Sequence, residues 1–517
     1  MTEGYRESVP VLTFPRQTFV SLLVFALIWE ALSYLAPYLG IPPFAIPSLV
    51  RIAKSIATIT PVDIVVTLAR VIAALIVSFL LGIALAMALY RSDSLDKYLH
   101  PMIRLFMAVP VVSWILFAVL WFPGVEFRIA FVLVVVCGPV FLIDTLDAMH
   151  GVPRELRHMM QSFRPTTWQY FFKLMLPAIV PTIFTSWKVN ISLAIRVVTI
   201  AELVGAVTGI GHQTFGGTGA VFRGRRVRLD TGAGGFAVPA RGNRRAGRSA
   251  RVAVARMNGP PPIAVRGLRK VFRQTTTGQS VIAIDRLDLD ISPREVVAIV
   301  GQTGCGKSTF FDLMIGLEAP TEGFIHIGDK SPHSDFDHFR GKIATVFQQD
   351  RLLPWRSALD NARLPLELIG LPEDEQRNRA LTWLQRLGLG NFIDAYPHEL
   401  SGGMRQRVAI ARAFSVEPDI LLADEAFGHL DEVTAAELRD TFLKLARECG
   451  STAILITHQL EEAISVGDRI VVFGQSAKLL ADIHVNRWKK TAYPLLREAI
   501  QSTLQSNRAD PRLANAS

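Results

Sequence analysis

The chain has 517 residues, which is enough for two or more domains at about 150 residues each. Its three cysteines, Cys137, Cys305 and Cys449, are too few and too scattered for a disulfide framework or a cysteine-rich zinc site. The net charge of +10 would usually indicate a nucleic-acid or membrane-surface protein. However, residues 216–262 alone hold ten arginines, one aspartate and no lysine, a net of +9, so the rest of the chain sums to about +1. The composition therefore excludes a generally basic protein.

Long apolar runs lie within about the first 210 residues, and the remainder has the composition of a soluble α/β protein. Five runs are long enough to cross a bilayer, which takes ~20 apolar residues in a helix. We place these runs near 19–39, 64–90, 102–122, 127–147 and 178–208. The third and fourth contain Pro110 and Pro139, which membrane bundles tolerate. A buried helix of a soluble core is the alternative for any single run, but five in series favour a membrane domain.

Basic residues in short loops predict the orientation of the spans. Arg91, Lys97 and Arg104 flank the loop after the second run, and further basic residues lie in the long loop after the fourth. Both loops, and the N-terminal segment 1–18, are therefore expected on the cytoplasmic side. That segment contains charges of both signs and two prolines, so we do not expect a cleavable signal peptide.

The long loop from Gly151 to Pro177 resembles the coupling helix of bacterial importer permeases. The family pattern is Glu-Ala-Ala, three residues, Gly, nine residues and Ile-x-Leu-Pro. When it is anchored on Leu176-Pro177, His158-Met159-Met160 replaces the acidic triplet and Arg164 replaces the glycine. The resemblance implies an amphipathic helix presented to a groove of an ATPase. Only the Leu-Pro end and the hydrophobic spacing support that role here.

Charged residues inside membrane spans are costly and are therefore functional candidates. Five qualify, namely Glu30, Arg70, Lys188, Arg196 and Glu202. Lys188 and Arg196 lie eight residues apart, about 80° around the fifth helix, so they are close enough to share a face and line an anion path. The alternatives are snorkelling at helix ends and pairing within the membrane, for example of Arg70 with Glu30.

The segment 216–262 holds no apolar window of 18 residues. It is either a flexible linker near anionic headgroups or the remnant of a lost sixth span. With the N-terminus in the cytoplasm, five membrane crossings place residue 215 on the opposite side of the membrane. The ATPase that follows must instead lie in the cytoplasm, where ATP is found. Ten glycines and ten arginines without lysine are typical of GC-rich coding sequence read out of frame. We therefore favour a frameshift or an imprecise gene fusion, with a re-entrant fifth segment as a further alternative; translation of the other two frames tests this.

A glycine-rich loop follows the apolar run Val296–Val300 and precedes a second apolar stretch that starts at Phe310. Strand, glycine loop and helix in this order predict a phosphate-binding loop, because backbone N–H groups and the helix N-terminus then face an anion. Lys307 would reach the β- and γ-phosphates, and the Ser308 hydroxyl would bind Mg²⁺. The candidate ATP-binding residues of the loop are Gly301, Gln302, Thr303, Gly304, Cys305, Gly306, Lys307, Ser308 and Thr309.

Five further motifs follow, namely Val346-Phe347-Gln348, Leu400-Ser401-Gly402-Gly403-Met404-Arg405-Gln406-Arg407, Ile420-Leu421-Leu422-Ala423-Asp424-Glu425, Gly428-His429-Leu430-Asp431 and Ile456-Thr457-His458. In this order they resemble the nucleotide-binding subunit of ABC transporters, across about residues 263–490. The Leu352-Leu353-Pro354-Trp355 stretch looks most like the branch that imports nitrate, sulfonate, taurine and bicarbonate.

The resemblance implies roles for individual residues. Asp424 and Gln348 would hold Mg²⁺ together with Ser308. Glu425 would polarise the attacking water as a general base, and His458 would contact the γ-phosphate. Phe272 would stack on adenine, with plain core packing as the alternative.

The resemblance also implies a dimer. Ser401, Gly402, Gly403 and Gln406 would complete the ATP site of a partner subunit, and Ser401 would cap the helix that follows. Two departures concern the contacts between subunits: Ala426 replaces a usual proline, and His429 replaces a small residue in the interface loop that ends at Asp431.

The predicted fold class is therefore multidomain. An all-α transmembrane bundle at 19–215, with its coupling loop at 151–177, precedes an α/β P-loop ABC ATPase domain at 263–490. The tail at 491–517 is expected to be a surface helix with a disordered end.

The predicted function is ATP-driven uptake of a small anion across the bacterial cytoplasmic membrane, with the ATPase domain in the cytoplasm. ATP and Mg²⁺ are the expected cofactors. The expected partners are a second copy or separate permease and ATPase subunits, an extracytoplasmic solute-binding protein and membrane lipid. The alternative is a defective fusion product that hydrolyses ATP without transport. The membrane spans disfavour a soluble ATPase acting on nucleic acid, and the loop before Pro177 disfavours an exporter.

Overall fold

In the computed structural model the chain forms two compact units. The helical unit comprises Met1–Gly151 and Ile179–Ala237, and the sheet unit comprises Val152–Ala178 and Val238–Ser517. The loop with the coupling-helix resemblance thus belongs with the sheet unit. The structure describes residues 16–41, 45–57, 59–206, 208–211, 259–273, 279–428, 430–485 and 493–506. The expectations for residues 1–15, for 216–258, for His429 and for the end of the tail lie outside these ranges.

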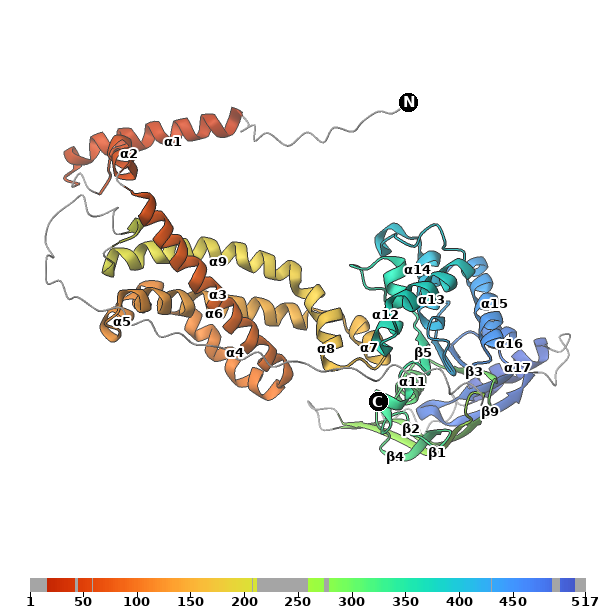
Figure 1. The fold of residues 1–517 in the computed structure, drawn as a ribbon. Helices are drawn as coiled ribbons and strands as arrows, with labels where there is room; N and C mark the ends of the chain where they lie inside the picture. Colours follow the sequence, from red (N-terminus) through yellow and green to blue (C-terminus); the bar gives the residue numbers. More distant parts are fainter. Residues whose placement is uncertain are drawn as a thin grey trace, which may run out of the picture. The chain divides into compact units, whose positions relative to one another are not determined.

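The helical unit is built from long apolar helices (Figure 1). Its elements are α1 Arg16–Leu35, the 3₁₀ turn η1 Ala36–Leu39, α2 Leu49–Ala57, α3 Pro61–Arg91, α4 Asp93–Ala108, α5 Val111–Trp121, α6 Val125–His150 and α9 Leu176–Gly205, whose first turn lies in the sheet unit.

Four helical stretches of the described residues are long and apolar enough to cross a membrane, namely Val20–Leu39, Pro61–Arg91, Val125–His150 and Thr167–Val204. They match the first, second, fourth and fifth predicted runs. The third run, 102–122, was predicted as one span and is instead broken. Helices Ser94–Ala108 and Val111–Trp121 meet at 91°, because Val109 adopts an extended conformation before Pro110. A residue that precedes proline avoids the helical region, which explains where the break falls.

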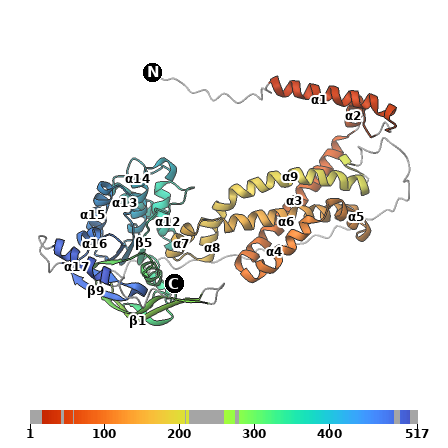
Figure 2. The same ribbon diagram turned by 180° about the vertical axis from the view of Figure 1, so that it is seen from behind.

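The core of the helical unit lies between α3, α5, α6 and α9. Figures 1 and 2 show α3 and α6 lying side by side. Their backbones approach closely at Gly82, where an added Cβ would lie 2.9 Å from the Phe141 Cβ and 3.1 Å from the Leu142 N. Small residues allow such close packing of membrane helices.

Gly82→Ala is therefore expected to lower the free energy of unfolding of the helical unit. Overpacking costs ~1–3 kcal/mol, which outweighs the ~1 kcal/mol that alanine gains over glycine in helix propensity. Thermal unfolding in detergent measures the change. Gly138→Ala is the matched control, because a Cβ at Gly138 would meet nothing within 4 Å. Equal melting temperatures for the two variants would contradict the close packing at Gly82.

An ionic network joins three helices of this unit, with Glu202 at its buried end and Glu126 at its exposed end. Arg70 on α3 donates to the Glu126 carboxylate on α6 at 2.5 and 2.8 Å and to Glu202 Oε1 on α9 at 2.7 Å. Glu202 is fully buried and also accepts from the Thr67 hydroxyl at 2.9 Å. The suggested pairing of Arg70 with Glu30 is wrong, because Glu30 Oε2 accepts instead from the Leu49 backbone N–H at 2.8 Å. The partner of Arg70 depends on which helices lie next to α3 in the fold, and sequence spacing does not reveal this.

Lys188 and Arg196, the candidate anion path, are both exposed on α9. In the same stretch of α9 the buried side chains include the polar Asn190, whose Nδ2 donates to the Ser186 carbonyl at 3.0 Å, and the apolar Ala194 and Val197. The two basic residues thus lie on the outer surface of a single helical unit. Their role in an anion path stays a prediction.

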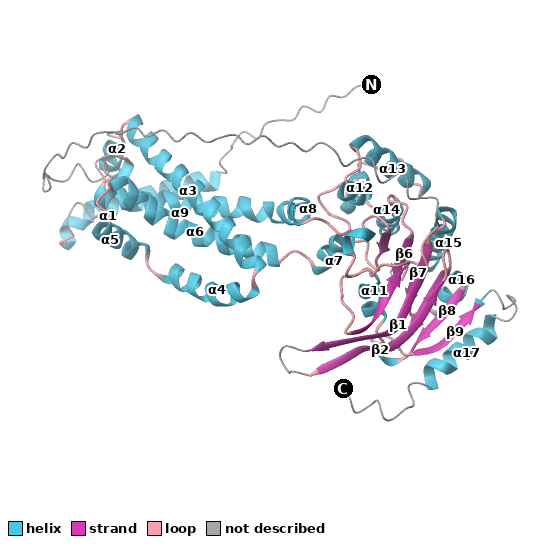
Figure 3. Ribbon diagram, turned by 60° about the horizontal axis from the view of Figure 1, so that its bottom comes forward, coloured by secondary structure: helices cyan, strands magenta, loops and turns pink. Residues whose placement is uncertain are grey.

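The sheet unit combines two sheets with surrounding helices (Figure 3). Its strands are β1 Ile263–Arg273, β2 Ser280–Ile291, β3 Val296–Gly301, β4 Glu322–Ile327, β5 Ile343–Val346, β6 Ile420–Asp424, β7 Thr452–Thr457, β8 Arg469–Phe473 and β9 Leu479–His484. Its helices are α7 Arg154–Ser162, α8 Thr167–Tyr170, α11 Lys307–Met314, α12 Ala358–Ile369, α13 Glu373–Arg386, α14 Gly402–Phe414, α15 Glu432–Cys449, α16 Leu460–Val466 and α17 Tyr493–Ser506. The short helical turns are the π-helical η2 Phe171–Met175 and the 3₁₀ turns η3 Phe336–Phe339, η4 Pro397–Glu399 and η5 Gln475–Ala477.

The larger sheet has the order β5-β6-β7-β3-β8-β9, and only the β8–β9 pair within it is antiparallel. Strands β3 and β7 are buried along their whole length, as continuous apolar runs in a parallel sheet should be. The carboxyl ends of β3, β6 and β7 lie next to one another, and the motifs of interest follow these ends. A smaller antiparallel sheet has the order β2-β1-β4. The predicted fold class, a helical membrane-type region followed by an α/β P-loop domain, is confirmed.

Candidate functional site

The glycine loop connects β3 to α11, as the sequence predicts. Its tight path depends on two glycines. A Cβ at Gly301 would lie 2.6 Å from the Cys305 Sγ and 2.8 Å from the Phe473 carbonyl oxygen. Gly306 caps α11 with φ of 107°, and a Cβ there would lie 2.4 Å from the Ala283 carbonyl oxygen. No other residue fits at either position, so the loop is shaped for close approach of a phosphate to its backbone.

Lys307 is the buried cation of this loop. Its Nζ donates to the carbonyl oxygens of Gly301 at 2.7 Å and Gln302 at 2.9 Å, which holds the ammonium group across the loop. Thr303, Gly304 and Ser308 are exposed, so the loop is open to a ligand, while Gln302, Gly306 and Thr309 are half-buried.

Cys305 has no chemical role in this loop. Its side chain is buried, and burial raises the pKa of the thiol. Its carbonyl oxygen accepts from the Ala477 N–H at 2.6 Å. A neutral, buried thiol is a poor nucleophile, which agrees with the sequence interpretation that the cysteine at this position is incidental.

Three motif residues that are far apart in sequence meet at Glu425. The Gln348 Nε2 donates to Glu425 Oε2 at 3.2 Å, and the His458 Nδ1 lies 3.2 Å from Glu425 Oε1. Glu425 follows β6 with φ of 44°, a left-handed conformation that is uncommon for a non-glycine residue. Its N–H is held by the Ile456 carbonyl at 2.8 Å. Backbone strain of this kind is characteristic of functional sites, where the surrounding fold maintains it.

Asp424 ends β6 directly before Glu425. Burial raises the pKa of its carboxyl to about 6, and the neighbouring Glu425 charge adds to this effect. A divalent cation would add positive charge to these adjacent acidic groups. Among the described residues, no group of three or more His, Cys, Asp or Glu side chains could hold a metal ion. Proteins usually bind Mg²⁺ through one or two carboxylates together with substrate phosphates, and the role of Asp424 in such a site stays a prediction.

Two side chains of α14 hold the loop around Gln348, and the sequence interpretation missed one of them. Arg412, fully buried, donates to the carbonyl oxygens of Asp350 at 2.7 Å and Arg351 at 2.9 Å. The Gln406 Nε2 donates to the carbonyls of Phe347 at 3.2 Å and Ala426 at 2.6 Å. An arginine inside the apolar turn of an otherwise buried helix was the signal that could have indicated this anchor. Gln406 is thus bound within its own chain, and its role toward a partner stays a prediction.

The remaining signature residues lie at a helix N-terminus. Ser401 caps α14 by accepting from the Met404 N–H at 3.3 Å, and both Ser401 and Gly402 are exposed. Gly403 is half-buried in the first turn. Asp431 caps α15 by accepting from the Thr434 N–H at 2.9 Å. The role of Ser401, Gly402 and Gly403 toward the nucleotide of a partner stays a prediction.

Phe272 lies on β1 with 37% of its surface exposed, and the Lys270 Nζ is 4.8 Å from its ring centroid. It pairs with Val281 on β2, two residues before Ala283, which touches the glycine loop. The ring is partly exposed, and its role in adenine stacking stays a prediction.

Phe272→Ala is expected to raise the Kd for ATP about 5- to 150-fold, because stacking of a base on an aromatic ring contributes ~1–3 kcal/mol. Titration calorimetry measures the change, and Phe272→Trp should retain affinity. Phe324→Ala removes a similarly exposed ring from the same small sheet and serves as the control. An unchanged Kd in Phe272→Ala would assign the ring to packing alone.

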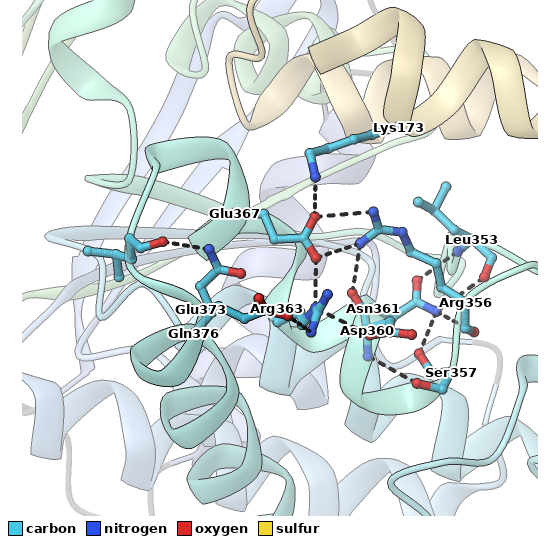
Figure 4. A network of polar contacts seen from close by, with 11 residues as sticks. Lys173, Leu353, Arg356, Ser357, Asp360, Asn361, Arg363, Glu367, Glu373 and Gln376 are labelled. Carbon is cyan, nitrogen blue, oxygen red and sulfur yellow. Dashed lines mark hydrogen bonds and ion pairs between the residues drawn. The ribbon is translucent and has the colours of Figure 1, made fainter. Parts of the chain in front are cut away.

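The coupling loop binds the ATPase part of the sheet unit through side chains. The Ser162 and Thr345 hydroxyls lie 3.0 Å apart, and the Gln169 Nε2 donates to the Leu368 carbonyl at 3.0 Å. Figure 4 shows Lys173 pointing at the Glu367 carboxylate on α12, with which it forms an ion pair. Three more contacts orient this carboxylate: Arg356 Nη1 at 3.0 Å and Nη2 at 3.2 Å, and Arg363 Nε at 2.8 Å.

Comparison with known proteins supports this geometry. A family profile described as ABC transporter matches residues 284–428. A second, described as binding-protein-dependent transport system inner membrane component, matches residues 78–220. Both halves of the chain thus resemble parts of one kind of transport machinery.

Three relatives illustrate the similarity of the ATPase half. The chain is 39% identical over 213 residues to the uncharacterized ABC transporter ATP-binding protein MJ0412 of Methanocaldococcus jannaschii, covering 41% of this chain and 76% of that protein. It is 40% identical over 205 residues to the taurine import ATP-binding protein TauB of Rhizobium johnstonii, covering 39% and 76%. It is 35% identical over 249 residues to the methionine import ATP-binding protein MetN 2 of Enterococcus faecalis, covering 47% and 72%.

Proposed function

Because this chain belongs to the ABC transporter family, with a permease region and an ATPase region on one polypeptide, we propose that it drives uptake of a small anion with ATP. The sheet unit is an ABC ATPase. The observation that carries the coupling to transport is the loop 152–178, which clusters with the ATPase while its chain continues into α9 of the permease region. The bacterial cytoplasmic membrane is the proposed location.

The proposed chemistry assigns a task to each residue at the ends of β3, β6 and β7. The backbone of the glycine loop and Lys307 bind the phosphates of ATP. Glu425 polarises the attacking water, and Gln348 and His458 hold its carboxylate from both sides. Asp424, Ser308 and Gln348 would hold Mg²⁺, which neutralises phosphate charge when it is bound.

The proposed substrate is a small anion of the nitrate, sulfonate, taurine or bicarbonate class. One relative is a taurine importer by name, and the other named importer takes methionine, so the cassette alone does not define the substrate. Exposed Lys188 and Arg196 supply the positive charge that an anion needs. Because they lie on the surface of one helical unit, the path would form between two such units.

The proposed assembly has two ATPase domains, because Ser401 and Gly402 are exposed at the N-terminus of α14, where the nucleotide of a partner would bind. A separate extracytoplasmic solute-binding protein would deliver the substrate, and the match to a binding-protein-dependent inner membrane component supports this. The second ATPase domain comes from an identical chain or from separate subunits.

Uptake by proteoliposomes tests the proposal. The purified chain is reconstituted with a candidate binding protein from the same genome, ATP is enclosed on the ATPase side, and labelled taurine, nitrate, bicarbonate and methionine are offered on the other side. We expect ATP-dependent accumulation of one of the anions and none with Glu425→Gln. Uptake of methionine alone would contradict the anion class.

A second candidate function is ATP hydrolysis without transport. The specific observation in its favour is that segment 216–262 contains no apolar window long enough for a sixth span. In that case the same vesicles hydrolyse ATP, and the rate does not respond to binding protein or substrate. Accumulation of any of the four solutes would exclude this candidate.

A further inference from the structure

Two side chains of the coupling loop contact α11, the helix that begins at the phosphate-binding Lys307. The His158 Nε2 lies 2.7 Å from Asp312 Oδ1, in the middle of this helix. The Arg164 Nη2 donates to the Ile315 carbonyl at 2.6 Å, and Ile315 is the residue that caps the C-terminal end of the helix. Both contacts fall at the positions where the importer pattern has its first acidic residue and its glycine.

Arg164 is buried where the coupling loop contacts the ATPase part of the sheet unit. Its side chain is 1% exposed, its Nη1 donates to the Phe336 carbonyl at 2.6 Å, and its guanidinium lies 4.4 Å from the Phe336 ring centroid. Its φ of 57° is the left-handed conformation that the glycine of the pattern adopts freely. The chain therefore places a buried cation at a left-handed position where glycine would be unstrained.

The chemistry of the Arg164 contact suits the end of a helix. The last carbonyl groups of α11 have no partners within the helix, and the helix dipole places partial negative charge there. Burial is the main cause that lowers the pKa of Arg164, to about 9, so the group remains charged at neutral pH. Among the described residues its Nε finds no hydrogen-bond partner, which shows that the site accepts an imperfectly satisfied cation.

His158 connects the same helix to the loop around Gln348. Its Nδ1 lies 3.0 Å from Arg351 Nη1, and the backbone carbonyl of Arg351 is the group that Arg412 holds. The imidazole thus lies between Asp312 of the phosphate-loop helix and the loop that carries Gln348. Movement of either element changes the surroundings of His158.

We propose that Arg164 and His158 are positioning residues that fasten the coupling loop to the phosphate-loop helix. Helix α11 has eight residues, about 12 Å of rigid rod, with the phosphate-binding Lys307 at one end and Arg164 at the other. Nucleotide binding at the first end is then transmitted to residues 152–178 through this rod, in addition to the loop around Gln348. This inference rests on the proposed function, since it deepens how ATP reaches the permease region.

Hydrogen–deuterium exchange of residues 152–178 tests the inference. The full chain is placed in lipid nanodiscs in the Glu425→Gln background, and exchange is compared with and without ATP and Mg²⁺. Arg164→Gly restores the residue of the pattern and relieves the left-handed strain, and His158→Ala removes the second contact. Arg154→Gln, at an exposed position of α7, is the matched control.

We expect ATP to change the exchange rates of 152–178 at least fivefold in the parent and in Arg154→Gln. The change should fall below twofold when Arg164→Gly and His158→Ala are combined, and Arg164→Lys should retain part of it because an ammonium can still bind the Ile315 carbonyl. Coupling between two sites is reciprocal, so contacts through which ATP affects the loop must also affect the affinity for ATP. The Kd for ATP of the double variant should therefore shift by the same factor by which its exchange response is reduced. A purely structural role would lower the melting temperature and leave the ATP response intact.

The outcomes separate the two proposals. A parent chain that binds no ATP overturns the proposed function together with this inference. A parent that binds ATP, with an equally large response in the double variant, overturns the inference alone. If Arg164→Gly does not fold, His158→Ala and Asp312→Ala decide the question, because each removes the contact between His158 and Asp312 without altering the buried cation.

Discussion

Replacing Glu425 with glutamine is expected to lower the kcat of ATP hydrolysis by about 10²–10⁴-fold while ATP remains bound, because a positioned general base contributes a factor of this size. Glutamine keeps the shape of the side chain and its contact with the Gln348 amide, but it cannot accept a proton from water. Release of inorganic phosphate measures the rate, and equilibrium dialysis measures bound ATP. Bound ATP that is not hydrolysed should also increase nucleotide-dependent pairing of ATPase domains.

The control for this prediction is Glu373→Gln, which neutralises an exposed glutamate on α13. Its turnover should match that of the parent. Turnover of Glu425→Gln within threefold of the parent would remove Glu425 from the role of general base. Loss of ATP binding would instead mean that the left-handed backbone at Glu425 had collapsed, since glutamine leaves the phosphate loop itself unchanged.

Lys307→Ala is expected to weaken ATP binding about 10- to 150-fold, which corresponds to the ~1.5–3 kcal/mol of a hydrogen bond to a charged group. In the ligand-free chain the Lys307 Nζ binds the carbonyls of Gly301 and Gln302. The variant therefore also loses some stability without nucleotide. The increase in melting temperature on addition of ATP separates binding from this loss of stability. A ligand stabilises the folded chain by an amount that depends on the ligand concentration relative to its Kd.

Lys444→Ala is the control for Lys307→Ala, because it removes an exposed ammonium from α15. Its ATP-induced increase in melting temperature should equal that of the parent. If Lys307→Ala also retains the full increase, the glycine loop binds the triphosphate through its backbone alone, and the assignment of Lys307 to the β- and γ-phosphates is wrong.

The sequence was sufficient where one local pattern determines one local structure. The glycines of 301–306 require a tight loop whatever surrounds them, and the apolar runs near 64–90 and 127–147 have one stable form in a bilayer. Both were predicted within a few residues. Pro110 was visible too, but its effect was underestimated, because the sequence does not show whether neighbouring groups will satisfy a broken helix.

The sequence was insufficient where the partner lies far along the chain. Arg70 binds Glu126 and Glu202 instead of Glu30, and Arg164 reaches Ile315, about 150 residues away. Departures from the family pattern at 158–164 only weakened the resemblance, since a substitution in a motif carries no information about the surface opposite it. The contacts show that Arg164 has its own binding site.

The sequence by itself determined the phosphate loop and the apolar helices of this protein, and it indicated Glu425 as the candidate for water activation. These follow from short-range rules of backbone geometry and hydrophobic length. Only the tertiary structure decided which charges pair, that Arg412 holds the loop around Gln348, and that the coupling loop contacts the phosphate-loop helix. Such contacts depend on how strands and helices distant in sequence come together, because burying a polar group requires a partner and the fold determines which one is in reach.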